Sequence, residues 1–365
     1  MLRIHKPPVA VPYVDDELGY ASAPEGLTAP RQRTKNISII IVISANTPLA
    51  HYSIALNSLQ CYALMHDYPL LIVKDEDYSD KCAYKDMMFR RHCVVVEVIN
   101  TEWALFLDAD VAVINPYRLI EEFIDDRFDV TLYDRFYNWE VAAGSYLIRN
   151  SAYAKQFLTD FAAYEKKLPN SFHGTDNGAL HMLLLDYVFP NETLRKPSGE
   201  SSMLYNDYLL CYRIWQRSKS YADLFLFEAC TRALMGIDPN HGRLRILRKG
   251  EGWMRDIWLT GSGWSNNDFL VHGIKNSQII SYPTNSIAEM WMQFKVLLGT
   301  QSKRDFVPPY TQLMNLDDCK TGNVTWYMEE RTHISDKQKR IILTRYDKSV
   351  ERQRWEIISG IGKYI

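Results

Sequence analysis

The stretch TEWALFLDADVAVINP, residues 101–116, contains the pattern that decides the fold. An apolar run, 103–107, ends in Asp108 and Asp110, and a second apolar run, 111–114, follows at once. Asp108 and Asp110 are two positions apart, and where a strand ends and the backbone turns, both side chains can reach one ligand. Because like charges repel, both carboxylates stay ionised only beside a cation, and a hard divalent ion prefers oxygen ligands. The stretch therefore predicts a metal site, and the immediate return of apolar residues disfavours a solvated turn.

The segments before this stretch alternate between strand and helix patterns. Residues 35–44 and 68–73 are short apolar runs that are typical of buried strands. Residues 51–67 carry apolar side chains at helical spacing, and residues 78–99 predict a second helix that runs into a further segment. This alternation indicates a doubly wound parallel sheet, and such sheets bind ligands at the carboxyl ends of their strands.

The remainder of the chain predicts further elements of the same α/β class. Two more strands and three more helices are expected, at residues 127–135 and 142–150 and at residues 151–168, 172–189 and 335–360. The last of these helices is expected to present a solvated basic face. Residues 190–221 show no clear period and are predicted to be irregular.

A second candidate metal ligand lies far along the chain, in LVHGIK, residues 270–275. His272 follows an apolar run that predicts a strand, and a neutral imidazole is a good ligand for an ion such as Mn²⁺. Gly273 would let the backbone approach a phosphate closely, and Lys275 would supply a positive charge for it. Asp108, Asp110 and His272 are therefore the predicted metal ligands.

Four motifs now carry a family likeness. FLDADVAVINP, AAGSYLIRN, HGTDNGALH and VHGIK occur in this order between residues 106 and 275. The order resembles that of the D-x-D glycosyltransferases of the GT-A fold. The likeness is greatest to the retaining galactosyl and xylosyl transferases of the galactomannan and mannan type, and to a nematode-expanded family related to them. The resemblance covers residues 35–282 and implies a Rossmann-like α/β fold with a mixed central sheet flanked by helices.

The resemblance also implies an activity and roles for single residues. It implies a retaining hexosyl- or pentosyltransferase that uses Mn²⁺ or Mg²⁺, a nucleoside diphosphate sugar as donor and a glycan hydroxyl as acceptor. The donor would be bound by residues after the first strand, at the D-x-D, in the small-residue turn and in VHGIK, namely Ser44, Ala45, Asn46, Lys85, Asp108, Ala143, Gly144, Ser145, Gly273 and Lys275. Lys85 is expected in the helix before the D-x-D. Asp176 and Asn177 would lie beside the transferred sugar as the catalytic pair.

Other readings of these residues remain open. Gly144 could permit a bulge, Asp176 could cap a helix, and Lys85 could be a solvated helix residue. One rival function is a haloacid-dehalogenase-type phosphatase, which also places a D-x-D after a strand. Ala112 does not fit that pattern, and the nucleophile strand of that class comes first in its domain. A second rival is a glycan- or nucleotide-binding protein that uses a transferase scaffold without catalysis.

Composition bounds the partners and the compartment. The chain has 365 residues and a formal net charge of −2, which disfavours a nucleic-acid partner. No apolar run approaches the ~20 residues that a membrane span requires. Its six cysteines lack CxxC spacing and could be thiols or disulfides, and N-x-S/T sequons occur at Asn36, Asn191 and Asn323. Cysteines, sequons and the resemblance together favour the Golgi or another secretory lumen.

Three regions are expected along the chain. Residues 1–34 hold many prolines and little apolar pattern, so they are predicted to be a disordered leader or linker. Residues 35–300 are expected to form the GT-A domain, and residues 301–365 a helical extension packed on it.

Overall fold

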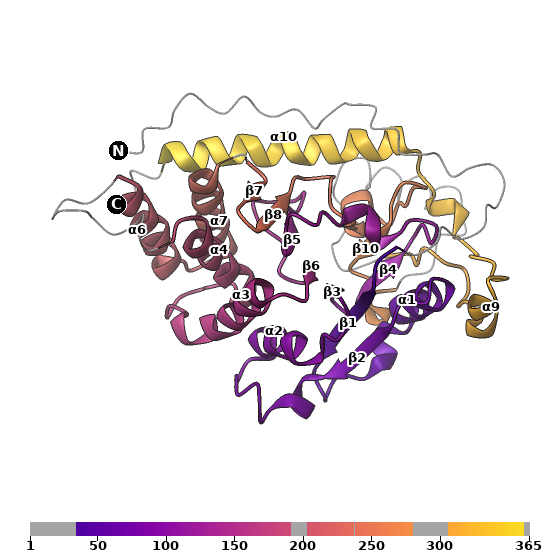
Figure 1. The fold of residues 1–365 in the computed structure, drawn as a ribbon. Coiled ribbons are helices and arrows are strands. Elements are labelled where there is room, and N and C mark those ends of the chain that lie inside the picture. The colour runs from indigo at the N-terminus through magenta and orange to yellow at the C-terminus, as the bar shows by residue number, and fades with distance from the viewer. Residues whose placement is uncertain (1–33, 191–202, 237, 280–305, 361–365) are drawn as a thin grey trace.

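The computed structural model describes residues 34–190, 203–236, 238–279 and 306–360, and the expected leader lies almost wholly outside them (Figure 1). Within these residues a seven-stranded central sheet has the order β2-β1-β3-β6-β5-β8-β7. Its strands are β1 (Ile37–Ile43), β2 (Leu70–Lys74), β3 (Trp103–Leu107), β5 (Val130–Tyr133), β6 (Ser145–Arg149), β7 (Asn240–His241) and β8 (Leu244–Leu247). All seven residues of β1 are buried, which explains its unbroken apolar run.

The direction of the strands confirms the mixed sheet that the resemblance implies and corrects the parallel sheet that the first segments indicated. β1 pairs parallel with both β2 and β3, as strands joined by helices do. β6, however, pairs antiparallel with both β3 and β5. The purely parallel sheet that the first segments indicated is therefore wrong for the whole sheet, and the expected fold class, an α/β fold with a mixed central sheet flanked by helices, is confirmed.

A smaller sheet of three strands, in the order β4-β10-β9, is also present among the described residues. β4 (Val111–Val113) is the apolar run that follows the D-x-D, and β10 (Leu270–His272) pairs antiparallel with it. β9 (Met254–Asp256) lies parallel to β10 on its other side. This pairing brings the end of the LVH run to the D-x-D.

Helices cover both faces of the central sheet. α1 (Ser53–Met65) packs through Leu56 and Leu59 into one apolar core, together with alternate residues of β1 and β3. The opposite core contains side chains of α2 (Met87–Val98), α3 (Ala152–Ala163), α4 (Thr175–Val188), α6 (Met203–Arg217) and α7 (Tyr221–Met235). The alternation along each strand thus supplies two separate apolar layers.

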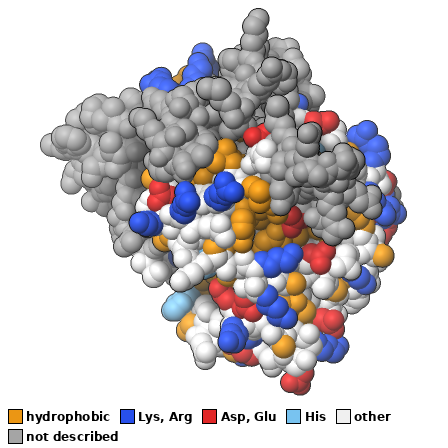
Figure 2. Space-filling view, turned by 90° about the vertical axis from the view of Figure 1, so that its left-hand side faces the viewer, with side chains coloured by type: hydrophobic (Ala, Val, Ile, Leu, Met, Phe, Trp, Pro, Cys, Tyr) orange, Lys and Arg blue, Asp and Glu red, His pale blue; other side chains and the backbone are white. Residues whose placement is uncertain are grey.

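The C-terminal region adds α9 (Leu316–Thr321) and the long helix α10 (Asp336–Gly360), which lies along one side of the molecule (Figure 1, yellow). α10 buries Leu343 against Leu259 and Phe136 and exposes Lys337, Arg345, Lys348 and Arg352. Among the described residues, no helix is both long and apolar enough to cross a membrane. Figure 2 shows a face on which apolar side chains gather in one patch bordered by charged ones.

Two predicted elements need correction. The helix expected over residues 78–99 begins only at Met87, because the side chain of Asp86 caps it by accepting a hydrogen bond from Met88 N. Lys85 is therefore not a helix residue. The segment predicted to be irregular, 190–221, contains α6 in its described part. The sequence did carry a signal for this helix, because Tyr208, Cys211, Tyr212 and Trp215 recur at helical spacing, and α6 packs against α4 and α7.

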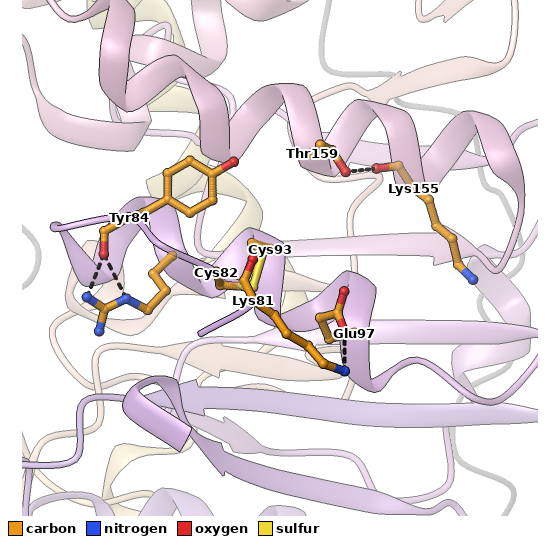
Figure 3. The surroundings of a disulfide bond; sticks show 8 residues. Lys81, Cys82, Tyr84, Cys93, Glu97, Lys155 and Thr159 are labelled. Atoms are coloured by element: carbon orange, nitrogen blue, oxygen red, sulfur yellow. Dashed lines mark hydrogen bonds and ion pairs between the residues drawn. A yellow bond between two sulfur atoms is a disulfide. The ribbon is translucent and has the colours of Figure 1, made fainter. Parts of the chain in front are cut away.

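All six cysteines of the chain are paired, as Cys61–Cys319, Cys82–Cys93 and Cys211–Cys230. The first links α1 to α9, and the third links α6 to α7. Figure 3 shows the Cys82–Cys93 disulfide beside the ion pair of Lys81 and Glu97, whose Nζ and Oε2 atoms are 2.9 Å apart. Structural disulfides persist in oxidising compartments, so the pairing agrees with a secretory or lumenal location.

Candidate active site

A cavity of about 280 Å³ opens at the carboxyl ends of β1 and β3, where a doubly wound arrangement would bind its ligand. Residues from both sheets and from the start of α4 line it. Nine of the predicted site residues are among them: Ser44, Asp108, Asp110, Ala143, Gly144, Asp176, Asn177, His272 and Lys275.

Asp108 follows the last residue of β3 and is held from two sides. Its Oδ1 lies 2.5 Å from Nη1 of Arg91, a buried side chain of α2. Its backbone N–H donates to the carbonyl oxygen of Gly144 at 2.9 Å. A Cβ at position 144 would overlap with Oδ2 and Cγ of Asp108, so the carboxylate occupies space that only glycine leaves open. Gly144 therefore has a steric role beside the D-x-D.

Asp110 precedes β4 and faces two cationic groups. His272 Nε2 lies 3.3 Å from its Oδ1, and Lys275 Nζ lies 3.3 Å from its Oδ2. The backbone N–H groups of Gly273 and Ile274 both donate to the carbonyl oxygen of Asp110, at 3.1 and 2.9 Å. The antiparallel pairing of β4 with β10, with Val111 opposite His272, produces this approach. The D-x-D and VHGIK segments thus form one site.

Asp176 lies in the first turn of α4 and reaches the same cavity. Gly174 caps this helix in a left-handed conformation, and no side chain makes a capping hydrogen bond, so the capping reading of Asp176 is excluded. Its Oδ2 accepts a hydrogen bond from Arg91 Nη2 at 2.5 Å and lies 3.4 Å from His92 Nε2. Arg91 consequently bridges Asp108 and Asp176, and all three residues line the cavity.

The surroundings shift the acidity of these groups in different directions. Burial raises the pKa of Asp108, and the nearby Arg91 guanidinium opposes that shift. Burial acts in the same direction on Asp110, but His272 and Lys275 outweigh it and bring the pKa of Asp110 well below its usual range. Burial lowers the pKa of His272, but the carboxylates of Asp110 and Asp256 outweigh burial, so the net effect raises this pKa to about 10. Asp110 is thus ionised at neutral pH.

Asp108, Asp110 and His272 fit a divalent ion. One ligand atom from each of the three lies within 4.8 Å of the other two. Two carboxylate oxygens and an imidazole nitrogen are a donor set suited to Mn²⁺, and also to Mg²⁺ when water and phosphate complete the shell. The three residues come from the end of β3, the start of β4 and the end of β10, so the pairing of the strands brings the set together.

The structure does not bring the other predicted residues to the cavity wall. Ala45 and Asn46 are exposed beyond β1, and Lys85 is exposed before α2. Ser145 is buried, where its Oγ donates to the carbonyl of Phe106 and accepts from Trp253 Nε1. Gly273 has φ +102, a conformation that favours glycine, and contributes its backbone N–H to Asp110.

Arg91 is the basic residue that the sequence interpretation missed. A signal was available, because Arg91 and Val95 are four residues apart on the buried face of α2, and a cation on an apolar face requires a partner. Asp256 was also missed. It hydrogen-bonds His272 from the neighbouring strand β9, and nothing in the short run MRD, 254–256, points to that contact.

Comparisons with solved structures gave partial similarity. The chain is 18% identical to a glycosyltransferase involved in glycosylation of the major capsid of PBCV-1, with a TM-score of 0.32, over 43% of this chain and 78% of that one. It is 18% identical to the apo form of glycosyltransferase GlyE of Streptococcus pneumoniae TIGR4, with a TM-score of 0.31. That match spans 42% of this chain and 44% of GlyE, less than half the length of either.

Comparisons of the sequence identify the family. No curated protein matches the chain significantly. A family model does match, over residues 59–289, which include the D-x-D, Asp176 and His272. Its description is "Protein of unknown function, DUF273". Because the match covers more than half of this chain, the chain belongs to the DUF273 family.

Proposed function

We propose that the protein is a metal-dependent glycosyltransferase that moves a hexose or pentose from a nucleoside diphosphate sugar, UDP-linked by preference, to a glycan hydroxyl. The observation that carries this proposal is the meeting of Asp108, Asp110 and His272 in one cavity at the carboxyl ends of the strands. A secretory compartment such as the Golgi, where glycans are built, is the location that we infer from the three disulfides.

The balance of charge around the cavity supports a divalent cation. When His272 is neutral, as a metal ligand must be, the carboxylates of the two ion-pair networks that contain the proposed ligands outnumber the permanent cations by two. These groups are Asp108, Asp110, Asp176, Asp256 and Glu140 against Arg91, Arg135 and Lys275. A divalent ion between Asp108 and Asp110 would neutralise this excess and reduce the repulsion between the two carboxylates.

The donor diphosphate would lie over the D-x-D. When bound, the metal would act as a Lewis acid that stabilises negative charge on the departing diphosphate. Lys275, which lines the cavity, would add a fixed positive charge to the diphosphate site. Ser44, at the end of β1, would contact the nucleoside. Ala45 and Asn46 are the next two residues along the chain, and we propose that their backbone, not their exposed side chains, lies near the nucleoside.

The sugar would lie against the small residues Ala143 and Gly144 and beside Asp176 and Asn177. Arg91 and His92 keep Asp176 ionised, and its carboxylate could stabilise positive charge that develops on the sugar ring. By resemblance the anomeric configuration would be retained. In this arrangement Arg91 takes the donor-side position that we expected for Lys85.

Calorimetric titration of UDP, with and without Mn²⁺, would test the proposal on the purified chain and on Asp110→Ala. We expect Mn²⁺-dependent binding that the substitution abolishes. A folded wild-type protein that binds neither UDP nor GDP in the presence of Mn²⁺ would contradict the proposal. Phosphate release from simple phosphoesters, without any sugar nucleotide, would support the phosphatase instead. UDP binding without transfer from any UDP-sugar tested would favour the non-catalytic scaffold.

A further inference from the structure

The two ring nitrogens of His272 face different partners. Nε2 points to the proposed metal site and lies 3.3 Å from Asp110 Oδ1. Nδ1 lies 2.8 Å from Oδ1 of Asp256, on the opposite side of the ring. The register of β9 and β10 sets this second contact, because Asp256 and His272 are paired residues of the two parallel strands. The imidazole is thus held between two carboxylates.

Asp256 is itself fixed in place. Only 4% of it is exposed, so its orientation depends on protein partners. Arg135 donates to both of its oxygens, from Nη2 to Oδ1 at 2.6 Å and from Nε to Oδ2 at 3.2 Å. Glu140 holds the same guanidinium from the other side, at 2.6 Å from Nη1. Arg135 and Glu140 are also joined through their backbones, since Arg135 N–H donates to the carbonyl of Glu140.

The chemistry of imidazole gives this arrangement a consequence. A carboxylate has no proton to donate, so the hydrogen bond at Nδ1 requires that Nδ1 carries the proton. In a neutral ring the lone pair then lies on Nε2, the nitrogen that points to Asp108 and Asp110. We propose that Asp256, held by Arg135 and Glu140, is a positioning residue that fixes His272 in the tautomer and orientation required of a metal ligand.

This inference rests on the metal site of the proposed function but predicts something that the ligands alone do not. Partners of this kind typically change metal affinity about 10- to 100-fold when they are removed. Asp256→Asn should therefore weaken Mn²⁺ binding by that factor, although none of the three proposed ligands is changed. Asparagine offers one acceptor oxygen where Arg135 and His272 together present three donor contacts to the carboxylate. The probe would be Mn²⁺ alone, measured by electron paramagnetic resonance.

Asp268→Asn is the matched control. Asp268 is as buried as Asp256, with 5% exposed, and likewise receives two hydrogen bonds from one arginine, Arg255. It does not line the cavity, and without its carboxylate Arg255 keeps contacts with Thr260 and Gly263. Both substitutions should lower the melting temperature, but only Asp256→Asn should weaken Mn²⁺ binding. An equal loss of affinity in the two variants would reduce Asp256 to a structural role and overturn the inference.

A second measurement needs no variant of Asp256. Nitrogen-15 NMR of the wild-type protein loaded with diamagnetic Mg²⁺ reports which ring nitrogen of His272 carries the proton, and His272→Ala assigns the signal. We expect the proton on Nδ1, and a proton on Nε2 would overturn the inference even if Asp256→Asn failed to fold. A wild-type protein that binds no Mn²⁺ would contradict the proposed metal site and this inference together. Wild-type binding that Asp256→Asn leaves unchanged would contradict this inference alone.

Discussion

The carboxylate of Asp108 lies where a side chain at position 144 would have to be, so Gly144 and Asp108 share one space at the end of β3. The two residues are also joined through their backbones, because Asp108 N–H donates to the carbonyl of Gly144. This hydrogen bond continues the antiparallel pairing of β3 with β6 beyond its last residue pair. Any side chain at position 144 must therefore displace the carboxylate or separate the strands.

Gly144→Ala is expected to impair the proposed metal site more than the fold. The added methyl group would displace the Asp108 carboxylate from its present position, and a displaced ligand should weaken Mn²⁺ binding by about 10-fold or more, a loss of about 1.4 kcal/mol in binding free energy. Calorimetry with Mn²⁺ measures the affinity, and thermal unfolding measures the accompanying loss of stability. Unchanged Mn²⁺ affinity in a folded variant would show that Asp108 is not a ligand.

Asp176 should make the stability of the protein sensitive to acid. Burial favours the neutral acid, but Arg91 and His92 outweigh it and lower the pKa of Asp176 to about 2. An unfolded aspartate has a pKa of about 3.9. Because the folded pKa is the lower one, its contribution is complete above about pH 5 and declines as the pH falls toward the folded pKa. The shift corresponds to roughly 2–3 kcal/mol of unfolding free energy.

Urea unfolding of the wild type and of Asp176→Asn at pH 6, 4, 3 and 2 would measure this contribution. The variant should be the less stable protein at pH 6, and the difference should shrink as the pH falls. Asp126→Asn is a suitable control, since Asp126 pairs with Lys35 at the surface and its side chain is 58% exposed. A difference between wild type and Asp176→Asn that stays constant with pH would contradict the expectation.

The Cys82–Cys93 disulfide should stabilise the segment that leads into α2. It joins the loop before the helix to the residue two positions after Arg91, and the sequence separation of the two cysteines is 11. Closing a loop of this length removes conformational entropy from the unfolded chain, which is worth about 3 kcal/mol. The double substitution Cys82→Ser, Cys93→Ser should therefore lower the unfolding free energy by about that amount, as measured by urea unfolding.

Thiol labelling followed by mass spectrometry provides the check on the pairing itself. Without reductant, the denatured wild-type protein should take up no alkylating reagent at any of its six cysteines. After reduction it should take up six equivalents. Alkylation of Cys82 or Cys93 before reduction would contradict the disulfide.

Local sequence patterns predicted the elements that depend on short-range periodicity. The apolar run before Asp108 is β3, the run at 35–44 contains β1, and the helical spacing at 51–67 contains α1. These predictions succeeded because a buried strand or an amphipathic helix must repeat its apolar residues at a fixed period. α6 was missed although Tyr208, Cys211 and Trp215 recur at helical spacing; its packing against α4 and α7 and its disulfide to Cys230 are known only from the structure.

The candidate site shows the same division. Asp108, Asp110 and His272 could be named from the sequence because each follows or interrupts an apolar run with a residue type that binds metals. Arg91 could have been preferred over Lys85, since Arg91 is a cation on the apolar face of its helix, but only the structure shows that the helix begins after Lys85. Asp256 could not be named at all, because its partner His272 belongs to a different strand.

The sequence by itself determined the α/β class, the strand that carries the D-x-D and the types of side chain available to bind a divalent cation. The tertiary structure alone decided that β6 runs antiparallel beside β3, that β10 pairs with β4 so that His272 reaches Asp110, and that Arg91 joins Asp108 to Asp176. The physical reason is that periodicity is a local property of the chain. Strand pairing and buried ion pairs, by contrast, depend on residues distant in sequence that meet only when the apolar layers close.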